Sequence, residues 1–401
     1  MVQDRFVPVS FASISATSTT LYTRRFDLLL NRFCVPQRKL DDGTIEEVKP
    51  PIFKEHQGGL SSKASRNLRK SINTLLIGVN EEILLSGKGK ENVTFATLTL
   101  PSSQFKSFDT NKVEYYATDK EIKRNCFNQL MTELKQTQGV NNYVWVCEKQ
   151  VNGNLHFHIL FDKRINWEWL RTRWNGLINK YGFVDRYQER FKSMNFEQYV
   201  SYCTNGKKAD EKRLNQLKKA FDFGQKTNWK QPNSTDIQAL KKVNNVAAYI
   251  SKYMSKGFGH SESKIKKYAS ALSAKYNLTD NDIRKIYTVE GRIWQCSQVI
   301  AKARKCISYC EVDFIPELDN LIETEKDIQV FKEERFTTIL HTIKQLKQKC
   351  NSIYETFLSH IRKYFNGMDN FDITSTSSNS VCDIVAPVSN RNVFQTKLSF
   401  T

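Results

Sequence analysis

The chain has 401 residues, of which 39% are hydrophobic, so it is long and apolar enough to bury a sizeable core and is not a disordered protein. It carries 61 Lys and Arg residues against 42 Asp and Glu residues, and the net charge of +19 favours a polyanionic partner, nucleic acid first of all. No apolar stretch approaches the length of a spanning helix, and the N-terminus lacks a basic segment followed by an apolar run. We therefore expect a soluble, cytoplasmic protein with no membrane partner.

The nine cysteines form no CxxC pair, and their number is odd. In a long chain without a secretion signal, buried free thiols are the expected state. The alternative is a zinc site at Cys296, Cys306 and Cys310, whose spacing suits one face of a helix.

Residues 1–90 are expected to be a basic segment with one helix. Ser61 or Ser62 can cap this helix, and its apolar stripe comprises Leu60, Ala64, Leu68, Ile72 and Leu75. Four basic residues remain outside the stripe, namely Lys63, Arg66, Arg69 and Lys70. They form either a solvated face or a contact with a DNA backbone, and both interpretations stay open.

The middle of the chain alternates strand and helix signals. A strand is expected over 92–100, a helix over 120–139, a hairpin of strands 143–150 and 155–161, and a helix over 166–182. A lysine-rich connector is then expected over 207–230, followed by a helix-start signal at 233–236 and a helical run that ends near Gly257. This order predicts an α+β fold, with helices packed on a central antiparallel sheet.

Four regions are expected along the chain. The basic segment precedes a main domain at 91–304, a helical C-terminal region at 305–366 and a disordered tail at 367–401.

The stretch "HFHILF" uses two of only six histidines. Side chains alternate along a strand, so His156 and His158 share one face while the apolar residues between them face the core. Paired neutral imidazoles are good ligands for a divalent metal, although two histidines on a half-exposed strand surface are the alternative.

Glu148 is the only carboxylate of the partner strand that could join the two histidines. If Asn152 and Gly153 alone formed the turn, Glu148 would lie opposite Phe157 and on the core face. If Val151, Asn152 and Gly153 form a three-residue loop with a left-handed Gly153, Glu148 lies opposite His156. We predict the second register, and with it a metal site of Glu148, His156 and His158.

The stretch "AAYISKYMSK" places Tyr249 and Tyr253 four residues apart on a helix, each with a lysine three residues on, Lys252 and Lys256. The alternative is an ordinary apolar stripe facing the core. Beside a metal site, these residues favour attack of a phenol on a DNA phosphodiester, with the lysines offsetting the developing charge.

Three motifs resemble those of the rolling-circle replication initiators of the HUH endonuclease superfamily, most closely the initiators of Microviridae phages and related plasmids. They are "FATLTLP", "EKQVNGNLHFHIL" and "YISKYMSK", in the family's order, and "GRIWQCS" resembles a further element of the phage initiators. The resemblance covers about residues 94–300. It implies a five-stranded antiparallel sheet with flanking helices, a site for Mg²⁺ or Mn²⁺, and Tyr249 as the first nucleophile with Tyr253 as the second.

The resemblance further implies that the protein nicks single-stranded origin DNA, leaving a 5′-phosphotyrosine link and a free 3′-OH, in the cytoplasm of a bacterial host. The chain has no GxxxxGK[ST] motif, so a helicase, like the DNA polymerase, is expected to come from the host. Two rivals use the same chemistry, a mobilisation relaxase and a transposase of the HUH type. A third rival is a basic, non-catalytic origin-binding protein whose aromatic residues only pack or stack on bases.

Overall fold

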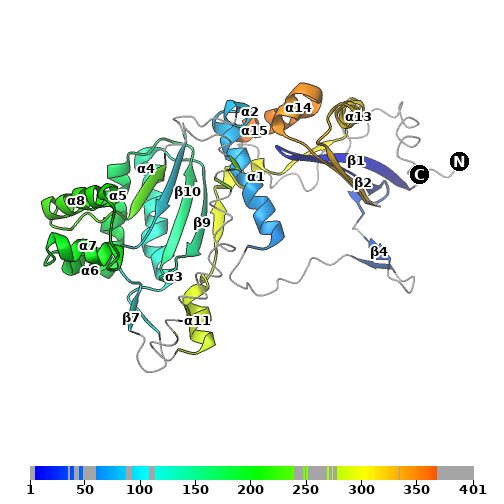
Figure 1. Cartoon of the computed structure of the whole chain (residues 1–401). Coiled ribbons are helices and arrows are strands. Elements are labelled where there is room, and N and C mark those ends of the chain that lie inside the picture. The colour runs from blue at the N-terminus through cyan, green and yellow to red at the C-terminus, as the bar shows by residue number, and fades with distance from the viewer. Residues whose placement is uncertain are drawn as a thin grey trace. The chain divides into compact units, whose positions relative to one another are not determined.

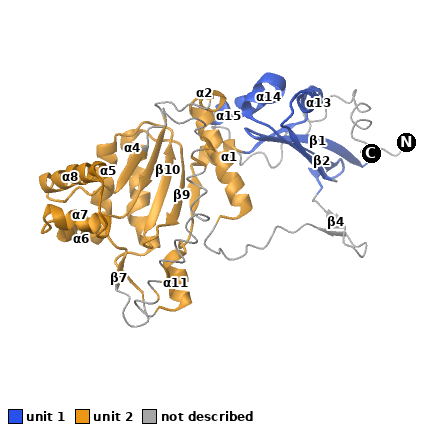
Figure 2. Ribbon diagram, in the orientation of Figure 1, with its two compact units in different colours: residues 1–52, 305–401 blue, residues 53–304 orange. Residues whose placement is uncertain are grey.

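The computed structural model describes residues 5–34, 37–39, 45–47, 60–86, 93–107, 113–238, 247–248, 250–251, 269–270, 273, 278–333 and 335–367. The chain divides into two units, which are coloured in Figure 2. One comprises residues 1–52 and 305–401, and the other comprises residues 53–304. Their elements give an α+β protein with antiparallel sheets, as the sequence predicted.

The unit of residues 53–304 is built on a five-stranded sheet with the order β11-β6-β10-β9-β12 (Figure 1). Every neighbouring pair is antiparallel. The strands are β6 (Thr94–Leu98), β9 (Tyr143–Lys149), β10 (Leu155–Phe161), β11 (Thr235–Gln238) and β12 (Trp294–Cys296). The sheet confirms the strands expected at β6, β9 and β10, and it has the five antiparallel strands that the resemblance implied.

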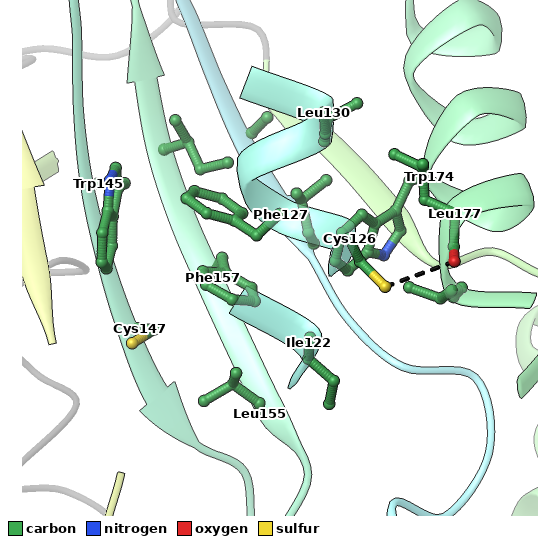
Figure 3. Packing of buried hydrophobic residues seen from close by; sticks show 14 of the residues in the cluster. Ile122, Cys126, Phe127, Leu130, Trp145, Cys147, Leu155, Phe157, Trp174 and Leu177 are labelled. Carbon is green, nitrogen blue, oxygen red and sulfur yellow. Dashed lines mark hydrogen bonds between the residues drawn. The ribbon is translucent and has the colours of Figure 1, made fainter. Parts of the chain in front are cut away.

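One face of the sheet is covered by the helices α3 (Asp119–Glu121), η1 (Ile122–Phe127), α4 (Asn128–Gln138) and α5 (Trp167–Ile178). Phe157 of β10 stacks on Phe127 of η1 with ring centroids 4.2 Å apart, and Trp174 of α5 lies across the same ring (Figure 3). All three side chains are fully buried. Each such burial stabilises the fold by about 1.5–3 kcal/mol, so this layer fixes which face of β10 is the core.

The helices that cover this face begin and end where the sequence predicted. Asn166 caps α5 by accepting from the backbone N–H groups of Glu168 and Trp169. Gly139 ends α4 in the left-handed conformation with φ of +64°. These local signals need no tertiary contact to act, which is why they could be read from the chain.

The opposite face of the sheet is partly covered by α1 (Ser62–Val79), which is followed by α2 (Glu82–Ser86). α1 contacts β9, β12 and α12 (Gln298–Ala303). Ser61 caps α1 by accepting from the N–H of Ala64 at 3.2 Å, and the predicted stripe residues Leu68, Ile72 and Leu75 are fully buried. The expected helix and its core face are thus confirmed.

A helical lobe lies between α5 and β11 in the chain and consists of η2 (Asn179–Tyr181), α6 (Phe183–Phe191), α7 (Phe196–Thr204) and α8 (Glu211–Lys226). Its own core comprises Phe191, Tyr199, Leu217, Phe221 and Trp229. The prediction of a connector over 207–230 was wrong, because its few apolar residues recur at helical spacing and bury into this cluster despite the surrounding lysines.

The helix start expected at 233–236 was also wrong, since residues 235–238 form β11 and pair with β6. Pairing with a neighbouring strand supplied hydrogen bonds that local capping propensity could not anticipate.

The end of the sheet near the β9–β10 turn is closed by the short hairpin β7 (Phe105–Ser107) and β8 (Glu114–Tyr115) and by α11 (Asp280–Tyr287). Phe105, Leu278 and Ile286 form a small core there. Tyr287 donates a hydrogen bond to the backbone oxygen of Val151, which holds the hairpin turn against α11.

The unit of residues 1–52 and 305–401 contains a sheet with the order β13-β1-β2-β15-β14, with β3 paired to β2. Its strands are β1 (Phe6–Ser15), β2 (Ser18–Asp27), β3 (Arg32–Phe33), β13 (Cys306–Tyr309), β14 (Gln329–Glu333) and β15 (Phe336–Leu340). Three helices accompany it, α13 (Phe314–Thr324), α14 (Ile343–Lys349) and α15 (Asn351–Phe365), and β4 (Gln37–Lys39) pairs with β5 (Ile45–Glu47).

The helical expectation for the C-terminal region was therefore right only in part, because residues 329–340 form a hairpin that pairs with the N-terminal β2. The expected disordered tail lies outside the described residues, apart from Gly367.

The eight cysteines among the described residues are free thiols, as expected. Cys306 lies in a strand, so the helical face that the zinc alternative required does not exist. Among the described helices, none is long and apolar enough to cross a membrane.

Candidate metal centre

The β9–β10 turn has the three-residue loop that the metal prediction required. Gln150 N–H donates to the oxygen of Asn154, Gly153 N–H donates to the oxygen of Gln150, and Gly153 has φ of +79°. The loop is therefore Val151 to Gly153, and the ladder pairs His156 with Glu148. The predicted register is confirmed.

Glu148, His156 and His158 come together on the face of the sheet opposite to Phe157. One ligand atom from each lies within 4.8 Å of the other two. His158 Nε2 is 3.2 Å from Glu148 Oε1, and the two imidazole rings meet edge to face with centroids 4.7 Å apart. The structure thus brings together the three predicted ligands.

The two histidines are nearly buried, whereas the Glu148 side chain keeps 21% of its exposure. Burial, aided by the nearby His158, lowers the pKa of His156 to about 3. The imidazole of His156 is therefore neutral near pH 7 and has a lone pair to offer a cation. The more exposed Glu148 marks the side from which a substrate can reach the site.

Neighbouring side chains fix both rings. Thr97 Oγ1 of β6 lies 3.4 Å from His158 Nδ1, and the Phe95 ring is stacked on His158. Gln150 Nε2 lies 3.1 Å from His156 Nδ1, and Gln150 Oε1 accepts from Thr99 Oγ1 at 3.3 Å. Each Nδ1 atom thus has a protein partner, which leaves the Nε2 atoms for a shared cation.

The sequence analysis named neither Thr97 nor Gln150. The alternation of strand side chains could have indicated Gln150, because it stands two residues after Glu148 and on the same face. Thr97 could not be found in this way, because its place beside His158 depends on the pairing of β6 with β10.

Of the other predicted site residues, Tyr249, Lys252, Tyr253 and Lys256 lie outside the described residues. The described positions around Tyr249 are Ala247, Ala248, Ile250 and Ser251, which are helical, and Ile250 is fully buried.

A buried ion pair supports the strand that carries Glu148. Lys149 Nζ lies 2.7 Å from Asp119 Oδ1, and both side chains are almost fully buried. Asp119 also accepts from Gln104 Nε2 at 2.8 Å and from the backbone N–H of Glu290 at 3.0 Å. Burial lowers the pKa of Lys149, and the charge of Asp119 opposes that shift. Asp119 thereby ties the end of β9 to α3 and to the segment before β12.

This geometry lies inside a segment that is similar to a known family. Residues 93–258 match the family of the replication-associated protein ORF2. The match covers less than half of the chain, and it contains β6, β9, β10, β11 and all three candidate ligands. No curated protein and no solved structure matches the chain. The similarity to replication-associated ORF2 proteins supports a role in replication initiation, and hence an interaction with DNA.

Proposed function

We propose that this protein initiates rolling-circle replication by cutting single-stranded origin DNA through metal-assisted attack of a tyrosine. The observation that carries the proposal is the convergence of Glu148, His156 and His158 within 4.8 Å on one sheet face. This convergence lies within the segment that matches a replication-associated family. The net charge of +19 fits a polyanionic substrate.

The donor set suits a divalent cation. Two neutral imidazoles and one carboxylate, all within reach of one point, are ligands that Mn²⁺ accepts readily, and the carboxylate and a phosphate oxygen also suit Mg²⁺. Glu148, His156 and His158 would hold the ion, and a bound Mg²⁺ or Mn²⁺ would polarise a non-bridging oxygen of the scissile phosphate.

Gln150 holds a proton in the place that this chemistry needs. Binding at Nε2 of His156 requires the proton of the neutral ring on Nδ1, where Gln150 lies at 3.1 Å. A half-turn of the Gln150 amide brings its oxygen to Nδ1–H and its nitrogen to Thr99 Oγ1, so both contacts survive. His156 is thereby held in one tautomer.

The chemical step is assigned to Tyr249. Its phenolic oxygen attacks phosphorus and forms the O–P bond of a 5′-phosphotyrosine, the P–O3′ bond breaks, and the departing oxygen takes a proton to become a free 3′-OH. Lys252 and Lys256 offset the negative charge that develops on the phosphate. Tyr253 attacks the regenerated origin after one round, which allows the displaced circle to be closed.

The free 3′-OH gives a DNA polymerase its primer. Because the chain contains no GxxxxGK[ST] motif, the helicase and the polymerase would both come from the host.

The test is a covalent-adduct assay with purified protein and a single-stranded DNA library that contains a randomised region. With Mn²⁺ present, we expect an adduct that survives denaturation and maps to Tyr249 or Tyr253 by mass spectrometry. Chelation or His156→Ala should abolish the adduct, and Tyr249→Phe with Tyr253→Phe should abolish it while DNA binding remains.

Tyr202→Phe is the matched control, because Tyr202 is an exposed tyrosine of α7 and should leave the yield of adduct unchanged. DNA binding without an adduct from any library member would contradict the nickase and favour the non-catalytic binding protein. An adduct that forms equally well without a metal would contradict the role of Glu148, His156 and His158.

A further inference from the structure

Trp294 stands on the same face and in the same cross-strand row as the candidate metal centre. β10 and β9 pair His158 with Val146, and β9 and β12 pair Trp294 with the same Val146. Directly opposed residues of a sheet send their side chains to one face, and adjacent strands are about 4.8 Å apart. The backbones of His158 and Trp294 are therefore about 10 Å apart along the sheet surface.

Three cations gather around Trp294. The Arg304 guanidinium lies 5.3 Å from the centre of the Trp294 ring, and its Nη1 donates to Ser71 Oγ of α1 at 2.9 Å. Arg66 and Lys70 stand one helical turn apart on α1. Burial and the charges of Arg66 and Arg304 lower the pKa of Lys70, which places the three charges within one electrostatic neighbourhood.

The three cations form a cluster of like charge. Among the described residues, no carboxylate forms an ion pair with Arg66, Lys70 or Arg304. Crowding like charges while partly burying one of them costs free energy, and an anion bound among them would offset that cost. An ordinary solvated face would spread its charges outward, as Lys63 and Arg69 do on the exposed side of the same helix.

We propose that Arg66, Lys70 and Arg304, with Trp294 supporting the guanidinium, bind a backbone phosphate of the single-stranded DNA that the metal centre holds. This inference rests on the proposed function and extends the substrate path across β9 to the edge strand β12. A separation of about 10 Å corresponds to about three nucleotides at the 3.4 Å spacing of helical DNA and to fewer in an extended strand. The cluster would thus hold the DNA close to the scissile phosphate.

The test measures binding of a fluorescent single-stranded DNA library in chelator, so that it does not depend on the metal or on nicking. The variant Arg66→Gln with Lys70→Gln should weaken binding, and the slope of log K against log salt should decrease by about 0.7 for each phosphate that the variant no longer neutralises. Lys63→Gln with Arg69→Gln removes the same charge from the same helix and should leave that slope near the wild-type value. Lys70→Arg keeps the charge and should bind like the wild type.

Circular dichroism of each variant verifies that α1 is retained. Equal losses in the cluster variant and in the Lys63 and Arg69 variant would reduce the effect to net charge and overturn the inference. Unchanged binding by the cluster variant would overturn it as well, even if the wild type forms the covalent adduct. Normal cluster-dependent binding without any adduct would instead contradict the nickase and leave the phosphate site standing.

Discussion

Gln150 lies 3.1 Å from Nδ1 of His156 and also accepts a hydrogen bond from Thr99 Oγ1, so a residue outside the ligand set fixes the orientation of one ligand. Such partners set the tautomer and the direction of a ligating ring, and their loss typically costs 10–100-fold in metal affinity. The contact therefore makes the role of His156 testable without altering a ligand.

We expect Gln150→Leu to weaken Mn²⁺ binding by at least about tenfold, as measured by titration calorimetry. Gln150→Glu should bind at least as tightly as the wild type, because a carboxylate accepts more strongly from Nδ1–H. Gln216→Leu, on the exposed side of α8, is the control. Equal affinity of Gln150→Leu and wild type would show that the amide does not orient the ring.

Gly153→Ala should destabilise the hairpin that holds the site. Gly153 has φ of +79°, and an added Cβ would lie 2.8 Å from both Ile286 Cγ2 and Phe105 Cε2. Backbone strain and overpacking together should cost about 3 kcal/mol in the free energy of unfolding in urea.

Gly206→Ala separates the two causes of that loss. Gly206 has φ of +72° and no neighbouring atom within 4 Å of its Cβ position, so only the backbone penalty of about 1 kcal/mol applies. Equal losses in the two variants would mean that the packing of the turn against α11 contributes nothing.

Breaking the buried pair of Lys149 and Asp119 should be costly. Lys149→Met leaves the Asp119 carboxylate buried without its cation, and we expect a loss of about 3–5 kcal/mol in urea unfolding. Asp119→Ala should cost more, because Gln104 and the N–H of Glu290 also lose their acceptor.

The exposed pair of Lys218 and Asp222 provides the comparison. Lys218→Met should change the free energy of unfolding by less than about 1 kcal/mol, since solvent screens this pair. A loss as small as this in Lys149→Met would contradict the structural role of the buried pair.

His341 should make the unit of residues 1–52 and 305–401 sensitive to acid. Burial lowers the pKa of His341 to about 4, and His341 Nε2 contacts Thr19 Oγ1 of β2 at 2.9 Å. The pKa is lower in the folded than in the unfolded state, so the stabilisation is complete above about pH 6.5 and is lost as the pH falls toward 4. The loss amounts to up to about 3 kcal/mol across that window.

Hydrogen exchange of β2 and β15 peptides at matched pH would measure this effect. His341→Gln has no proton to take up, so the difference in protection between wild type and variant should change in favour of the variant between pH 6.5 and 4. A difference that stays constant with pH would contradict the assignment.

The sequence by itself determined the features that local physics controls. A three-residue turn with a left-handed glycine and the alternation of strand side chains were enough to place Glu148 opposite His156 and to put both histidines on one face. The caps at Ser61 and Gly139 fixed helix ends in the same way. Such signals act within a few residues, so no knowledge of the fold was needed to use them.

Only the tertiary structure decided which distant segments meet. β1 pairs with β13 and β2 with β15 across about 300 residues, and Arg304 reaches Ser71 of α1 from 233 positions away. The residues at 235–238 became a strand because β6 offered an edge, and the lysine-rich stretch at 211–226 became a helix because its few apolar residues found an aromatic core. Burial and strand pairing depend on partners remote in sequence, and no local rule specifies those partners.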